Sequence, residues 1–229
     1  MHKINTPTPK QQLCAVTLLG NLVAKPDIRY RANPVSAITE ITLATNSKWL
    51  DKKTNQFKEW TSYHHITVVG DLVEQTLLNA DKGDIILVQG HLSNIKTSNT
   101  KQTDDSKINN QSIVHASFIQ KFNKGYTQTV NQILCSGQLV SQPKLITTQN
   151  NKNLMHVNIT INHQFYSVDK QSWQNHKVER ELHVWGKQAQ YLVENAQLGD
   201  NVMVEGKLSY LATADKSQFI EAKTVHLLG

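Results

Sequence analysis

The segment from His64 to Ser93, "HHITVVGDLVEQTLLNADKGDIILVQGHLS", decides the fold because the chain contains a second copy of it. The copy runs from Arg180 to Ser209, "RELHVWGKQAQYLVENAQLGDNVMVEGKLS", and aligns with the first without a gap. Identical residues meet at Val68, Gly70, Asn79, Ala80, Gly83, Asp84, Val88, Gly90, Leu92 and Ser93. Further upstream, "LLGNLVAKPDI" meets "CSGQLVSQPKL", with Gly20 over Gly137. A repeat of this length is a domain. We therefore predict two related domains, residues 11–124 and 125–229.

Each copy shows the periodicity of short strands with one helix. The strands expected in the first copy are 15–23, 37–45, 61–69, 84–92 and 112–122, with a short helix after the third strand that ends at Gly83. Those expected in the second copy are 131–140, 153–162, 180–185, 201–209 and 219–228, with a helix at 188–195. Five strands with a helix between the third and fourth are the arrangement of the OB-fold, a small Greek-key barrel. The predicted class is all-β, with two tandem OB-folds, and Gly20 and Gly137 are expected to bend the first strands.

Composition limits the possible functions. The chain has 229 residues and a formal net charge of +6, which favours polyanionic partners such as nucleic acid. Residues 1–124 carry 15 Lys and Arg against 10 Asp and Glu, and residues 125–229 carry 9 against 8, so the first domain is expected to dominate phosphate contact. No apolar run is long enough to span a membrane and the N-terminus does not resemble a signal peptide, so we expect a cytoplasmic protein without membrane contact. Cys14 and Cys135 are expected to be reduced core thiols.

One polar segment is crowded with aromatic residues. "ATNSKWLDKKTNQFKEWTSYHH", from Ala44 to His65, places Trp49, Phe57, Trp60 and Tyr63 among lysines. Single-stranded nucleic acid exposes the faces of its bases beside charged phosphates, so its binders combine aromatic rings with Lys or Arg. The segment is expected to span the end of the second strand, a loop and the third strand, where OB-folds bind oligonucleotides. Since an aromatic residue in a strand is more often part of a core, each ring taken alone also fits a structural role.

Basic residues suited to phosphate contact lie in three places. The candidates are Lys48, Lys52, Lys53 and Lys58 in the aromatic segment, Arg29 and Arg31 after the first strand, and Lys96, Lys101 and Lys107 in the long loop before the fifth strand.

The segments "LLGNLVAKPDIRY", "ITLATNSKWLDKKTNQFKEWTSYHHITVVG" and "KGDIILVQGHLS" closely resemble the bacterial single-stranded DNA-binding protein family, SSB. The second half, with "NQILCSGQLVSQPKL", "MHVNITINH" and "GDNVMVEGKLS", also resembles primosomal replication protein N, which belongs to the same superfamily. The resemblance places Trp49 and Tyr63 on stacking positions of the family. Two other such positions carry Val69 and Thr97, which are not aromatic.

In the second domain, Phe165 aligns with Trp49, and Trp185 aligns with Val69 and restores an aromatic residue there. Trp173, in the loop expected before the third strand, is a further candidate.

The hypothesis that follows is sequence-independent binding of single-stranded DNA in replication, recombination or repair. The resemblance implies a homodimer with four OB-folds. The alternative is a primosomal adaptor that links single-stranded DNA to a restart helicase or other replication proteins, and a third possibility is a repurposed RNA-binding module. The chain ends on "EAKTVHLLG" without the acidic tail of common SSBs, so recruitment through such a tail is not expected. No catalytic, metal or cofactor motif is found, and His64 and His65 point to opposite faces of a strand, so we expect neither an enzyme nor a metal site.

Overall fold

The computed structural model describes residues 12–228 except 34, 52–53, 97–109, 123–124, 126–127, 149–150, 168–170 and 212–216. The first domain contains β1 (Cys14–Leu22), β2 (Arg29–Ala32), β3 (Val35–Asp51), β4 (Gln56–Val69), the π-helical turn η1 (Val73–Leu77), β5 (Ile85–Lys96) and β6 (Asn110–Phe122). The second contains β7 (Val130–Leu139), β8 (Lys144–Thr147), β9 (Asn153–Ser167), β10 (Ser172–Trp185), α1 (Lys187–Asn195), β11 (Asn201–Tyr210) and β12 (Gln218–Leu228). None of the helices in these ranges is long and apolar enough to cross a membrane.

Each domain closes into a barrel by the same two pairings. In the first domain β4 pairs in parallel with β6, and β1 pairs with β3 at Asn21 and Leu22. In the second domain β10 pairs in parallel with β12, and β7 pairs with β9 at Gln138 and Leu139. The predicted order of five strands with a helical element between the third and fourth is confirmed. The short strands β2 and β8 were not predicted, and both are fully exposed ribbons on the margins of the sheet.

Gly20 and Gly137 allow the first strand of each barrel to pair on two sides. A Cβ atom on Gly20 would lie 2.4 Å from the carbonyl oxygen of Ala44, and one on Gly137 would lie 2.9 Å from that of Thr160. Both distances are shorter than real Cβ contacts, so the close approach of β3 to β1 and of β9 to β7 requires a residue without a side chain.

The second and third strands of each domain are longer than predicted. β3 continues to Asp51 and β4 begins at Gln56, so the aromatic segment is a β-hairpin and not a loop. β9 likewise continues to Ser167, and β10 begins at Ser172 and not at residue 180. The prediction was wrong because these extensions leave the barrel and carry polar residues on both faces, which removes the apolar alternation that marks a strand.

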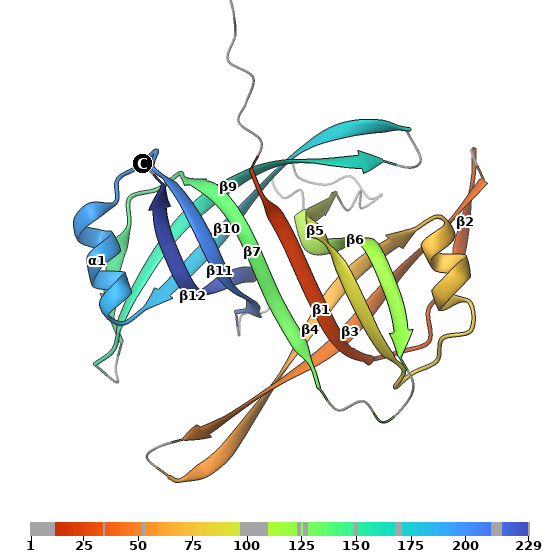
Figure 1. Cartoon of the computed structure of the whole chain (residues 1–229), viewed down its shortest axis with the longest axis horizontal. Coiled ribbons are helices and arrows are strands. Elements are labelled where there is room, and N and C mark those ends of the chain that lie inside the picture. The colour runs from red at the N-terminus through yellow and green to blue at the C-terminus, as the bar shows by residue number, and fades with distance from the viewer. Residues whose placement is uncertain are drawn as a thin grey trace, which may run out of the picture.

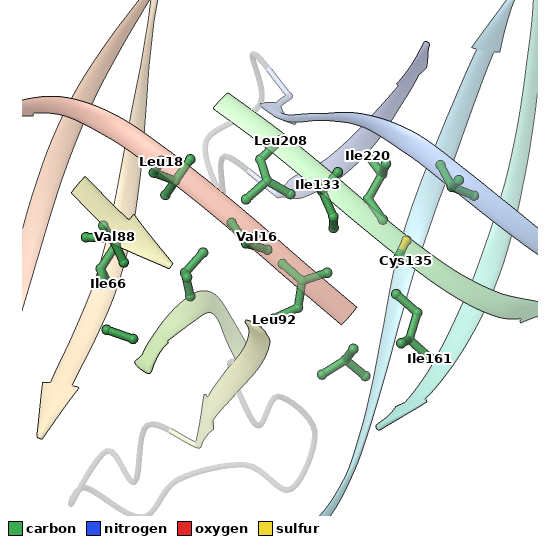
Figure 2. Packing of buried hydrophobic residues seen from close by; sticks show 14 of the residues in the cluster. Val16, Leu18, Ile66, Val88, Leu92, Ile133, Cys135, Ile161, Leu208 and Ile220 are labelled. Carbon is green, nitrogen blue, oxygen red and sulfur yellow. The ribbon is translucent and has the colours of Figure 1, made fainter. Parts of the chain in front are cut away.

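The two domains join through β1 and β7, which pair antiparallel and merge all twelve strands into one sheet. Val16 pairs with Ile133, and the alignment of Gly20 with Gly137 makes these two residues equivalent. An antiparallel contact between equivalent residues relates the domains by an approximate twofold axis. Figure 2 shows Val16 and Leu18 on β1 beside Ile133 and Cys135 on β7, within one buried cluster that continues through both barrels.

The twofold relation also places each long hairpin beside the other domain. Figure 1 shows the β3–β4 hairpin extending past β11 and β12, and the β9–β10 hairpin extending past β5 and β6. Two buried polar residues at aligned positions make the contacts. His64 Nδ1 lies 3.0 Å from the Tyr210 hydroxyl, and Arg180 Nη2 donates to the Ser93 carbonyl oxygen at 2.8 Å. The structure therefore fixes both hairpins against the neighbouring barrel.

Candidate nucleic-acid interface

All four tryptophans of the chain are exposed on the two long hairpins. Their exposed fractions are 46% for Trp49, 61% for Trp60, 67% for Trp173 and 41% for Trp185. A tryptophan in a folded protein is normally largely buried, because its ring is the largest apolar surface that a side chain offers. Four exposed rings on equivalent elements therefore indicate a binding surface, and none of the four belongs to the core.

Trp49 and Trp60 lie on the inner face of the β3–β4 hairpin. On β3 the buried residues of the barrel occupy alternate positions up to Thr45, and Trp49 continues that face beyond the barrel. Together with Ser47 and Ser62, the two rings form one wall of a cleft of about 440 Å³. The facing wall belongs to the second domain and consists of Lys207, Ser209, Tyr210, Phe219 and Glu221. The cleft, which we call the tryptophan cleft, is wide enough for flat groups to enter beside the rings.

Tyr63 lies on the opposite face of the hairpin from Trp49. Its cross-strand partner is Ala44, whereas that of Trp49 is Lys58. Successive strand residues alternate between faces, so positions 49 and 58 share one face and positions 44 and 63 share the other. Tyr63 is 53% exposed, and Phe57 is exposed on the same outer face. The predicted stacking pair is therefore divided between two faces, and one base cannot touch both rings.

Several of the predicted cations are paired with carboxylates. Lys48 Nζ lies 3.2 Å from Glu59 and 5.2 Å from the centre of the Phe57 ring. Lys58 pairs with Asp51, which is its neighbour across the hairpin. Arg29 donates two hydrogen bonds to Asp27, at 3.0 and 2.8 Å.

For the other predicted cations the structure gives only the place of Arg31 and the strand position of Lys96. Arg31 is exposed on β2. Lys96 ends β5, and its side chain lies outside the described residues, as do Lys52, Lys53, Lys101 and Lys107. The described cations of the hairpin thus hold its shape as well as supplying charge.

The outer face of the second domain carries Trp173 and Trp185. Trp173 pairs with Tyr166 across the hairpin, and their rings meet edge to face at 5.9 Å between centres. Trp185 pairs with Leu154 near the other end of β10. Tyr166 is half exposed and was not predicted as a site residue. Its signal was the pair "FY" in a strand, where only one of two adjacent rings can face inward.

Phe165 is enclosed by imidazole rings. It stacks on His91 with ring centres 4.6 Å apart and an angle of 30° between the ring planes. The rings of His115, His163 and His176 lie within 6.4 Å of it. We call these four histidines and Phe165 the imidazole cluster. The Phe165 ring is only partly buried and His91 stacks on one face of it, so its stacking on a base stays a prediction.

Burial holds His91 and His163 of the imidazole cluster in their neutral form. The pKa of His91 is lowered to about 3, mainly by burial and further by the neighbouring rings of His115, His163 and His176. Burial also lowers the pKa of His163 to about 4 and lowers that of His176. A cleft of about 720 Å³ opens beside these rings, and His91, His163 and Phe165 line it together with Tyr166 and the start of β1.

Comparison with known proteins agrees with this architecture. The sequence profile of the single-strand binding protein family matches residues 13–119 and 130–227. The wild-type single-stranded DNA binding protein from Thermus aquaticus superposes with a TM-score of 0.77 at 23% identity, over 96% of this chain and 94% of that one. A deletion mutant of that protein gives a TM-score of 0.76 at 24% identity, over 95% of each chain. These likenesses show the fold, a pair of OB domains in one chain.

Proposed function

This chain belongs to the single-strand binding protein family and binds single-stranded DNA, and we propose that the strand lies across the exposed rings of the two long hairpins. We assign the OB domains to residues 11–124 and 125–229, as the repeat predicts. The single observation that carries the proposal is the exposure of every tryptophan of the chain on the same two elements.

The rings account for binding without sequence preference. Each base presents an apolar face, and stacking on an aromatic side chain contributes about 1–3 kcal/mol per base whatever its identity. The tryptophan cleft offers Trp49 and Trp60 from one side. The outer faces offer Tyr63 in the first domain, and Trp173, Tyr166 and Trp185 in the second. A strand that visits only some of these rings already gains several stacking contacts.

Charge supplies the second part of the affinity. The net charge of +6 attracts the phosphate backbone, and counterions released from phosphates make the binding constant fall as salt rises. Lys207 lies on the rim of the tryptophan cleft, 3.3 Å from Glu221, and can contact a phosphate beside a base stacked on Trp49 or Trp60.

The proposal is tested by titration with oligo(dT) while tryptophan fluorescence is recorded at increasing salt. We expect quenching at low salt, steep weakening as salt rises, and a loss of about 1–3 kcal/mol of binding free energy in Trp49→Ala. The matched control is Tyr191→Ala, which removes an exposed ring on α1, an element outside the two long hairpins. No quenching at low salt, or equal losses in the two variants, would contradict the proposal.

We further propose that two chains pair to bring four OB domains together. The outward face of β1 and β7, opposite the barrel core, carries Ala15 and the exposed Leu134, and Phe118 on β6 is exposed on the same side. A sheet face with exposed apolar side chains is suited to contact with a second copy. Light scattering should give twice the mass of one chain, and a monomer at all concentrations would refute the pairing.

A further inference from the structure

Three side chains of metal-ligand type converge on the outer face of the second domain. His156 lies on β9, and Glu181 and His183 lie on β10. His156 Nε2 is 2.7 Å from Glu181 Oε1, and His183 Nε2 contacts the same oxygen. One donor atom from each residue lies within 4.8 Å of the others. Both imidazoles thus direct a ring nitrogen at one carboxylate oxygen.

The strand register builds this arrangement. His183 and His156 are direct cross-strand partners, and Glu181 is two residues along β10 on the same face. The His183 ring packs on Phe219 of β12, with ring centres 4.2 Å apart. The His156 ring stands at 84° to that of His183, with centres 5.2 Å apart. Packing on Phe219 therefore orients the His183 ring, and the contacts with His183 and Glu181 orient that of His156.

The cluster is accessible from solvent on one side. The exposed fractions of the side chains are 38% for His156, 26% for Glu181 and 12% for His183. The residues aligned with them in the first domain are Glu40, His65 and Thr67, which do not repeat the set. The arrangement is therefore a property of this domain and not a consequence of the shared fold.

We propose that His156, Glu181 and His183 form a binding site for a divalent transition-metal ion of the zinc class. Two neutral imidazoles and one carboxylate are a donor set that Zn²⁺ accepts, with one coordination position left for an outer ligand. In the absence of an ion, imidazole N–H groups donate to the carboxylate. Binding the metal needs both Nε2 lone pairs, so each Nε2 proton moves to Nδ1 of the same ring or to water.

The position of the site suggests what the fourth ligand is, and this step rests on the proposed function. Trp185 follows His183 by two residues on the same face of β10, and Trp173 lies toward the other end of that strand. On this face of β10 the two carboxylates of Glu179 and Glu181 outnumber the one ammonium group, that of Lys177. A bound dication would reverse the local charge beside Trp185, so that a phosphate oxygen of the strand could occupy the open position.

The site itself is tested without DNA. Untagged, metal-free protein is titrated with Co²⁺ by visible absorption and then with Zn²⁺ in competition. We expect one ion per chain, and a loss of affinity of about 100-fold or more in His156→Ala and in Glu181→Gln. The control His226→Ala removes an exposed histidine on β12 of the same domain and should bind as the wild type does. No uptake by the wild type, or equal uptake by wild type and both site variants, would overturn the site.

The phosphate contact is tested separately by oligo(dT) affinity in Zn²⁺ and in chelator. Zinc should tighten binding of the wild type by about tenfold or less and leave His156→Ala unchanged, since one additional charged contact is gained. Equal affinities in both conditions would overturn the phosphate contact, while a failure to bind oligo(dT) at all would count against the proposed function and not against the metal titration.

Discussion

The tryptophan cleft and the imidazole cluster occupy equivalent places in the two halves of the molecule. Trp49 aligns with Phe165 and Trp60 with His176 on the long hairpins. On the facing wall, the cross-strand pair Lys207 and Glu221 corresponds to the pair His91 and His115. One place holds exposed indoles beside a cleft of about 440 Å³, and in the other the imidazole rings pack around Phe165 beside a cleft of about 720 Å³.

The difference shows that the facing wall decides what a hairpin ring can do. An ion pair such as Lys207 with Glu221 keeps its hydration, so the indoles opposite remain in contact with water. His91 is uncharged at neutral pH because its pKa is lowered to about 3, and the rings of His91 and His115 pack against Phe165. The same backbone thus produces a surface available to bases in one half and a contact between domains in the other.

The largest expected effect is an acid instability that comes from the buried histidines. Their folded pKa values of about 3 for His91 and about 4 for His163 and His64 lie below the unfolded value near 6.5. The unfolded chain therefore binds protons that the folded chain does not, so this stability is complete above pH 6.5 and is lost as the pH falls toward 4. Each such histidine contributes up to about 1.4 kcal/mol per pH unit in that window.

Urea unfolding at pH 7 and pH 4.5 measures this loss, with His91→Gln as the variant that removes one titrating group. A wild-type stability that is the same at both pH values, or an equal loss in wild type and His91→Gln, would show that protonation of His91 does not cause acid instability.

A second, smaller effect separates the equivalent residues Phe165 and Trp49. Phe165→Ala should reduce the free energy of unfolding by about 3 kcal/mol, at the low end for loss of a packed phenylalanine because its ring is only partly buried. Its oligo(dT) affinity should change little. Trp49→Ala should show the reverse, with reduced affinity and nearly unchanged stability. Urea unfolding and fluorescence titration on both variants check this. Equal changes in stability and in affinity for the two variants would show that Phe165 and Trp49 have the same role.

The smallest effect concerns the ion pair of Lys48 with Glu59. Both side chains are exposed, so Glu59→Gln should change stability by no more than about 1 kcal/mol. The released Lys48 should tighten oligo(dT) binding slightly and raise the salt slope by about one. The control Glu205→Gln removes the partner of Lys223 on β11 and changes the net charge equally. If both variants bind alike, net charge and not the position of Lys48 is responsible.

The repeat and its periodicities predicted the fold almost completely. Ten identities over thirty aligned positions indicated two copies of one domain. The alternation of apolar and polar residues inside the barrels located the five main strands of each domain. The outer halves of the long hairpins were missed because strand pairing there is maintained by cross-strand ion pairs, such as Lys58 with Asp51, and by exposed rings. In these segments apolar and polar residues do not alternate, so the sequence gives no strand signal there.

The candidate site was predicted in its residue types and only partly in its geometry. All four tryptophans were named, and all four are exposed. Trp49 and Tyr63 lie on different faces because of the pairing register of β3 and β4. That register depends on the turn between Asp51 and Gln56, which the sequence did not locate. Phe165 packs against His91 and His115 of the other domain, and the sequence around Phe165 cannot predict that contact.

The sequence alone determined that this chain is a duplicated five-stranded barrel with aromatic and basic residues grouped between its second and third strands, because repeats and periods are properties of neighbouring residues. Only the tertiary structure decided which rings face water, which lysines are paired, and that His156, Glu181 and His183 meet. Those outcomes depend on side chains brought together from distant strands and across the twofold axis, where small differences in the facing wall change what each ring contacts.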